Sequence, residues 1–190
     1  APYLAGGGAS ARVGDASHDV RWATGPARHE AGTPNLLGAV ALAAVCDALE
    51  AADRTALHER EQALLTRLRD GVASIDGVAE LRIFDAAAER VGIVSFAVEG
   101  RESAEVAAAL GRRDIGVRDG LFCAHPLARR LLGEAAQRSG WAAAPATALR
   151  ASIGLGTTEA EVDAFVTALA DIVASPAGAT PASAGCAVAA

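Results

Sequence analysis

Residues 91–98 read Val-Gly-Ile-Val-Ser-Phe-Ala-Val, and this stretch decides the fold class. It is apolar at both alternating sets of positions and lies between Arg90 and Gly100, which predicts a strand that is covered on both faces of its sheet. Three weaker strand patterns accompany it, at 81–84, 115–118 and 149–155. Together these stretches predict one small sheet.

Helical patterns surround the strands. Helices are expected at 55–76 and 102–112, and from a Thr158–Glu161 capping box onward to about residue 173. The long excursion 119–148 carries a helical patch at 127–137. This order predicts an α/β fold, an α+β sandwich in which the small sheet is backed by helices.

A further helix is expected at 35–51. Thr33 is the expected N-cap and Pro34 the expected first helical residue. Small and apolar residues occur nearly all round this helix, Cys46 among them, which predicts a buried element. Residues 1–25 show no sustained periodicity of apolar residues, so irregular structure is expected there. This stretch includes the triplet Gly6-Gly7-Gly8.

Composition narrows the function classes. The chain has 190 residues, of which 52% are hydrophobic, and its net charge is −6, so wholesale disorder is excluded. The arginines are scattered, which argues against nucleic acid as a partner, and no apolar run reaches the roughly 18 residues of a membrane span. No histidines, cysteines or acidic residues have the spacing of a metal site. From residue 175 onward Pro, Gly, Ala and Ser predict a disordered tail, so its cysteine, Cys186, is given no site.

Three short stretches of the sequence contain candidates for chemistry. Gly32 and Thr33 at the mouth of a helix suit an anion, although a plain N-cap explains them as well. Cys123 lies in a glycine-containing loop near Arg118 and is either a nucleophile or an inert thiol, while His125 is interpreted as structural. Arg150 stands in an otherwise apolar strand and needs an anionic partner, either a protein carboxylate or a ligand carboxylate held by a bidentate fork.

Three motifs resemble one family. Residues 30–35 (Glu-Ala-Gly-Thr-Pro-Asn) resemble a signature of class V aminotransferases and of the cysteine desulfurases among them. Residues 116–126 resemble the cysteine loop of that family, and residues 149–152 with 157–163 resemble its closing Arg-Ala-Ser block. The motifs occur in family order over roughly residues 1–174.

The resemblance implies a homodimeric enzyme of fold type I that uses pyridoxal 5'-phosphate (PLP) in the cytoplasm. It implies that Thr33 and Gly32 reach the PLP phosphate and that Arg150, with Arg118, binds the carboxylate of an amino acid. In cysteine desulfurases the cysteine that matches Cys123 takes the sulfur of L-cysteine, leaving a persulfide for an acceptor protein and releasing alanine.

Two departures qualify the resemblance. The chain has no lysine, so it cannot form the Schiff base that holds PLP. It therefore resembles the C-terminal half of such an enzyme, inactive alone. Leu121-Phe122 stands where sulfur-transferring members often carry two histidines, which leaves aminotransfer open. The same departures leave open a non-catalytic binding module and an inactive fragment.

The expected organisation follows from the resemblance. It comprises an active-site loop segment from the end of the large domain, linking helices, a small C-terminal α/β domain and the tail, at 1–33, 34–76, 77–174 and 175–190.

Overall fold

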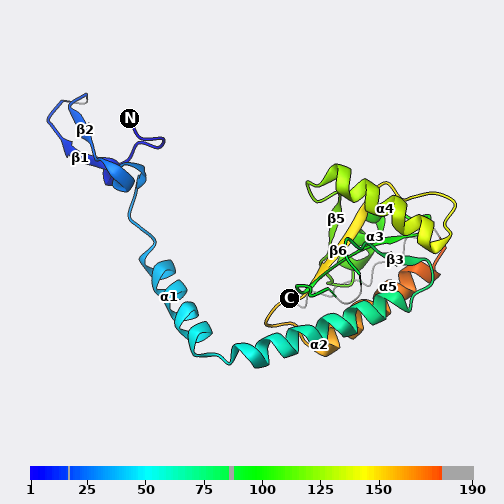
Figure 1. Ribbon diagram of the computed structural model, residues 1–190. Coiled ribbons are helices and arrows are strands. Elements are labelled where there is room, and N and C mark those ends of the chain that lie inside the picture. Colours follow the sequence, from blue (N-terminus) through cyan, green and yellow to red (C-terminus); the bar gives the residue numbers. More distant parts are fainter. Residues whose placement is uncertain (17, 86–87, 177–190) are drawn as a thin grey trace, which may run out of the picture. The chain divides into compact units, whose positions relative to one another are not determined.

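The computed structural model describes residues 1–16, 18–85 and 88–176, and Figure 1 labels their helices and strands. The chain divides into two compact units, the first Ala1–Ala52 and the second beginning at Asp53. The predicted fold class is confirmed, because the second unit combines one antiparallel sheet with helices. Most of the predicted tail, residues 177–190 with Cys186, lies outside the described residues.

The first unit begins with a small hairpin. A 3₁₀ turn, Gly7–Ala9, leads into β1 (Ser10–Val13), which pairs antiparallel with β2 (Val20–Trp22) before a second 3₁₀ turn, Gly25–His29. The prediction of irregular structure over 1–25 is therefore wrong at these two strands. Strands this short offer too few residues for an alternating pattern to be recognised.

Helix α1 (Leu36–Ala51) has a different cap from the one predicted. The Gly38 N–H donates to Asn35 Oδ1 at 2.8 Å, so Asn35 is the N-cap. Neither Thr33 as cap nor Pro34 as first helical residue is correct, because the asparagine directly before Leu36 supplies the acceptor. The Thr33 hydroxyl is thereby left free of a capping role.

The predicted burial of α1 is also wrong. None of its residues is buried, Leu37 is 82% exposed, and Cys46 is exposed rather than part of a core. A helix that is apolar all round requires a cover, but its sequence does not say which chain segment provides it. The described residues leave α1 as an exposed apolar surface of the kind that marks an interaction site.

The sheet of the second unit has the order β3-β4-β6-β5, with every neighbouring pair antiparallel. Its strands are β3 (Val78–Glu80), β4 (Ile93–Val98), β5 (Arg118–Gly120) and β6 (Ala148–Ser152). The strand predicted at 91–98 is confirmed as β4. β3 lies at 78–80 instead of 81–84 and β5 at 118–120 instead of 115–118, because pairing with β4 and β6 sets their ends.

Helices cover both faces of this sheet (Figure 1). The helices α2 (Arg54–Ala73), α3 (Ser103–Gly111) and α5 (Glu159–Ala174) pack on one face, around Leu68, Phe96, Leu149 and Leu169. Helix α4 (His125–Ser139) packs on the other face, where its Leu132 forms a smaller core with Ala97 and Ala148 of the sheet. The helices predicted at 55–76, 102–112 and 127–137 are confirmed, with ends shifted by a few residues.

The capping box that begins α5 is confirmed. The Thr158 N–H donates to Glu161 Oε2 at 2.7 Å, and the Glu161 N–H donates to Thr158 Oγ1 at 3.2 Å. These bonds hold the pKa of the Glu161 carboxyl below its ordinary value. Arg67 of α2 donates to Asp163 at 2.6 Å, which ties α2 to α5 and lowers the pKa of Asp163. Within the described ranges, no helix is both long and apolar enough to cross a bilayer.

Candidate functional site

Two arginines stand directly opposite each other on neighbouring strands. Arg118 of β5 pairs with Arg150 of β6, and Ser95 of β4 pairs with Arg150 on its other side. Directly opposite residues point to the same face of a sheet, so the three side chains form a row. They share the face that α4 covers, since Ala148, two residues before Arg150, belongs to the α4 core.

Neither of these arginines has a carboxylate partner within residues 1–16, 18–85 and 88–176. In the described part of the chain no ion pair or hydrogen bond involves either side chain, and the Arg150 Nε is buried with no acceptor. By contrast, Arg69 and Arg82 each bind the buried Glu80 carboxylate at 3.0 Å. A buried donor without an acceptor costs about 1–3 kcal/mol, and like charges that face each other destabilise a sheet. The arginine pair is suited to an anion from outside the described residues.

The cysteine loop is a tight turn just before α4. The Ala124 N–H donates to the Leu121 carbonyl at 2.9 Å and closes the turn. Phe122 (φ 54°) and Cys123 (φ 57°) both have left-handed backbones, which cost roughly 1–3 kcal/mol each for residues of this kind. The Cys123 side chain is exposed. Backbone strain of this size is typical of functional loops.

Phe122 joins this loop to the arginine row. Its ring centroid lies 5.3 Å from Arg150 Cζ, a cation–π distance. The structure therefore brings the loop of Cys123 next to Arg150 and Arg118 on one face of the sheet. His125 is the first residue of α4 and is exposed.

Gly32 and Thr33 belong to the first unit. In the part of the chain that the structure describes, their backbone N–H groups and the Thr33 hydroxyl donate to no acceptor. A backbone hydrogen bond joins this loop to the glycine triplet, since the Gly8 N–H donates to the Ala31 carbonyl at 3.3 Å. A Cβ at Gly8 would lie 2.4 Å from the Glu30 carbonyl oxygen, so only glycine permits this approach. Free donors on such a loop fit a phosphate group.

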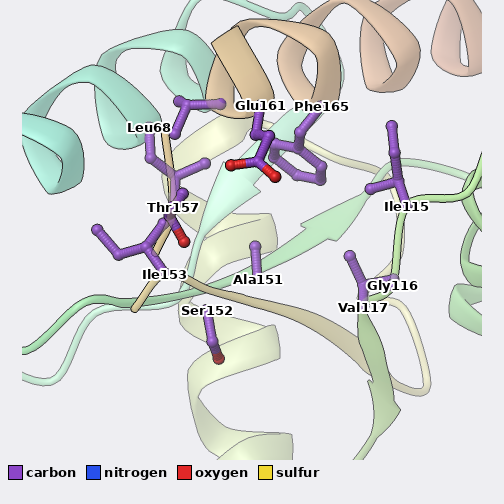
Figure 2. Close-up of a pocket in the computed structure, with 11 residues that line it drawn as sticks. Leu68, Ile115, Gly116, Val117, Ala151, Ser152, Ile153, Thr157, Glu161 and Phe165 are labelled. Atoms are coloured by element: carbon purple, nitrogen blue, oxygen red, sulfur yellow. The ribbon is translucent and has the colours of Figure 1, made fainter. Parts of the chain in front are cut away.

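Two of the pockets in the second unit lie beside its sheet. Figure 2 shows one of about 180 Å³ on the face opposite Arg150, with Leu68, Ala151 and Phe165 in its wall. Its one carboxylate, Glu161, already accepts the capping bonds of Thr158, which leaves no free charged group there. The other pocket, of about 250 Å³, is largely apolar and has Phe122 in its wall.

Sequence reasoning missed several residues of the site. Phe122 gave no signal beyond standing in place of a histidine, and its contact with Arg150 spans 28 positions of the chain. Ser95 was hidden inside an apolar strand. The glycine triplet was visible, but its role in holding residues 30–32 depends on a contact between distant segments. No group of three potential metal ligands occurs among the described residues.

Comparison with known proteins shows the family of the chain. The family model described as aminotransferase class-V matches residues 1–165. A probable cysteine desulfurase of Xylella fastidiosa (strain Temecula1) is 32% identical over 169 residues, which are 88% of this chain and 36% of that protein. A cysteine desulfurase of Cronobacter sakazakii is 32% identical over 88% of this chain and 37% of its own length.

Two solved structures share the fold. The cysteine desulfurase CsdA of Escherichia coli has a TM-score of 0.61 at 26% identity, covering 90% of this chain and 38% of that one. The cysteine desulfurase of Thermococcus onnurineus NA1 has a TM-score of 0.60 at 29% identity, covering 90% and 39%.

One antiparallel sheet covered by helices on both faces places the second unit among mixed α/β proteins, and the family match makes this class specific. The chain belongs to the class-V aminotransferase family, whose members depend on PLP. It spans a little over a third of the length of the curated relatives that it matches.

Proposed function

We propose that this chain forms the carboxylate-binding, cysteine-bearing part of a PLP-dependent enzyme that converts L-cysteine to L-alanine and leaves the sulfur on Cys123. The observation that carries the proposal is the pair Arg118 and Arg150, which face each other on two neighbouring strands and have no carboxylate partner among the described residues. An amino-acid substrate would supply that carboxylate.

Each arginine has a defined task in this proposal. Arg150 binds the substrate carboxylate through its planar N–H donors, and Arg118 adds a second positive charge on the same face. Binding at two guanidinium groups fixes the orientation of the amino acid before any bond changes. Arg150 is half-buried, so its charge is less screened there than at a surface.

Gly32 and Thr33 would hold the phosphate of PLP through backbone and hydroxyl donors that meet no acceptor in the described structure. PLP, when bound, supplies the electron sink for bond breaking next to the amino group. The chain contains no lysine, so it supplies no amine to anchor PLP covalently. We therefore expect the 190-residue chain alone to be inactive and the reaction to need further sequence.

Cys123 would take the sulfur atom. Its thiolate attacks the sulfur of bound L-cysteine, an S–S bond forms, the C–S bond breaks, and the carbon skeleton gains a proton to become alanine. The exposed position of Cys123 suits this role, since the thiol must reach the substrate and then meet an acceptor. A sulfur acceptor protein is the proposed partner of the persulfide, and a homodimer in the cytoplasm is the proposed setting.

A second candidate is aminotransfer or another class-V reaction in which Cys123 is a bystander. The observation that favours it is Leu121-Phe122 before the cysteine, because neither side chain exchanges protons. A non-catalytic binding module is the contrasting candidate, and it predicts no PLP dependence in any longer form of the protein.

The test uses the protein expressed from the complete reading frame that contains this chain. We expect a PLP-loaded protein that releases sulfide from L-cysteine, with release abolished by Cys123→Ser and retained by the control Cys46→Ser, since both thiols are exposed. Sulfide release that survives Cys123→Ser would refute the role of Cys123. PLP loading without sulfide release would favour aminotransfer, and a protein that binds no PLP would favour the binding module.

The phosphate role of Thr33 has its own test in the same protein. Thr33→Ala is expected to speed the loss of PLP on dialysis, because one hydroxyl donor is removed. Full PLP retention by that variant would count against this role. Thr33→Ser retains the hydroxyl and serves as the matched control.

A further inference from the structure

The guanidinium of Arg150 rests on an aromatic ring and on no polar group of the described chain. Phe122 lies with its ring centroid 5.3 Å from Arg150 Cζ. The Nε of the same arginine is buried without an acceptor. A ring contact occupies none of the N–H donors of a guanidinium, so it does not compete with a ligand for them.

Two features hold the ring in this place. The turn closed by the Ala124 N–H and the Leu121 carbonyl, with its left-handed Phe122, turns the side chain back toward the sheet. The ring then packs against the smaller core together with Leu121 and Trp141. The turn therefore fixes the backbone of Phe122, and the neighbouring core residues fix its ring, before any ligand binds.

We propose that Phe122 is a positioning residue for the carboxylate site. Its ring holds the Arg150 guanidinium in the receiving orientation while leaving the N–H donors free. This inference rests on the proposed function of Arg150. A carboxylate at position 122 would consume those donors, and a cation would repel the guanidinium, whereas an aromatic ring attracts the charge without competing for the ligand.

The contact is measured directly by NMR on the ¹⁵N-labelled 190-residue chain. A proton above an aromatic ring is shifted upfield, so the Arg150 Nε–H resonance is expected upfield of the other arginine Nε–H signals. Arg150→Met assigns the resonance by removing it. Phe122→Leu is expected to abolish the upfield shift, and Phe122→Tyr to retain it, because only tyrosine keeps a ring.

Trp141→Leu is the matched control. It removes an aromatic side chain from the same core but not from Arg150, and the upfield shift is expected to persist. An Arg150 signal in the wild-type chain without an upfield shift would overturn the contact, and this result does not depend on any variant folding. A shift that survives Phe122→Leu would overturn it as well.

The consequence for binding is tested in the complete PLP-loaded protein. Phe122→Leu is expected to raise the KM for the amino-acid substrate about two- to thirtyfold, the range of one cation–π contact, with a smaller change in kcat. Phe122→Tyr is expected to restore the KM. An unchanged KM in Phe122→Leu, alongside a raised KM in Arg150→Met, would refute the positioning role alone. An unchanged KM in Arg150→Met would refute the proposed function on which it rests.

Discussion

Replacing Arg150 by methionine separates a ligand-binding arginine from a structural one. In the described structure the Arg150 Nε is a buried donor without an acceptor, which costs about 1–3 kcal/mol. The cation–π contact with Phe122 stabilises the folded state by about 0.5–2 kcal/mol. These two ranges overlap, so Arg150→Met is expected to change the unfolding free energy of the 190-residue chain by an amount between a loss of about 1 kcal/mol and a gain of about 2.5 kcal/mol.

Binding is expected to respond very differently. Removing one partner of a buried charge pair costs about 2–5 kcal/mol, which corresponds to a roughly thirty- to several-thousand-fold weaker affinity for an amino-acid carboxylate. The affinity is measured by titrating the complete PLP-loaded protein with L-alanine and following its visible absorption. Unfolding of the 190-residue chain is measured by urea denaturation.

Arg67→Met provides the matched control. Arg67 has two carboxylate partners, Asp163 at 2.6 Å and Glu159 at 3.2 Å, and it lies on α2, away from the face of the arginine row. It is expected to lose a small amount of stability and no affinity. A loss of about 3–5 kcal/mol in unfolding free energy for Arg150→Met, with unchanged affinity, would show that Arg150 belongs to a structural ion pair and would refute the reasoning.

Two further predictions concern the first unit and the start of α5. Gly8→Ala is expected to displace residues 30–32 and to weaken PLP retention in the complete protein, because its Cβ would lie 2.4 Å from the Glu30 carbonyl oxygen. The control is Gly7→Ala, whose Cβ would meet nothing within 4 Å and which should leave PLP retention unchanged. Equal PLP retention in both variants would contradict the account. Thr158→Ala is expected to cost about 0.5–2 kcal/mol of unfolding free energy at neutral pH. Because the folded state holds the pKa of Glu161 below its ordinary 4.5, the contribution of the Glu161 carboxylate, which accepts from the Thr158 N–H, is full above that value and disappears as the pH falls through the lower folded pKa. Glu161→Gln carries no titrating carboxyl, so it should be less stable than wild type at neutral pH, and this gap should close in acid during urea denaturation; a gap that stays constant down to low pH would contradict the carboxylate cap.

The sequence predicted the elements that carry a strong pattern of their own. The strand at 93–98 has apolar residues on both faces, and α5 begins with a capping box, so local information sufficed for both. The strands β3 and β5 were misplaced because three residues carry no usable period and their ends are set by their neighbours. The prediction that α1 is buried was wrong because an apolar helix indicates that it needs a cover but does not say which segment covers it.

The same distinction between local patterns and tertiary contacts applies to the site residues. Arg150 was visible because a charged residue in an apolar strand is conspicuous, and Cys123 and Thr33 were visible through the family motifs. The facing of Arg118 and Arg150 depends on strand register, which pairs residues 32 positions apart. The Phe122 ring reaches Arg150 because of a left-handed turn that no residue type in the loop demands. Such placements arise from tertiary contacts and become visible only in the folded chain.

The most direct test of the central claim locates the transferred sulfur atom. The complete PLP-loaded protein is incubated with L-cysteine in the absence of a reductant, alkylated, digested and examined by mass spectrometry. The account predicts one extra sulfur atom on the peptide that carries Cys123 and none on the peptide that carries Cys46, which is also exposed. Alanine or sulfide formed with no added sulfur on Cys123 would contradict it.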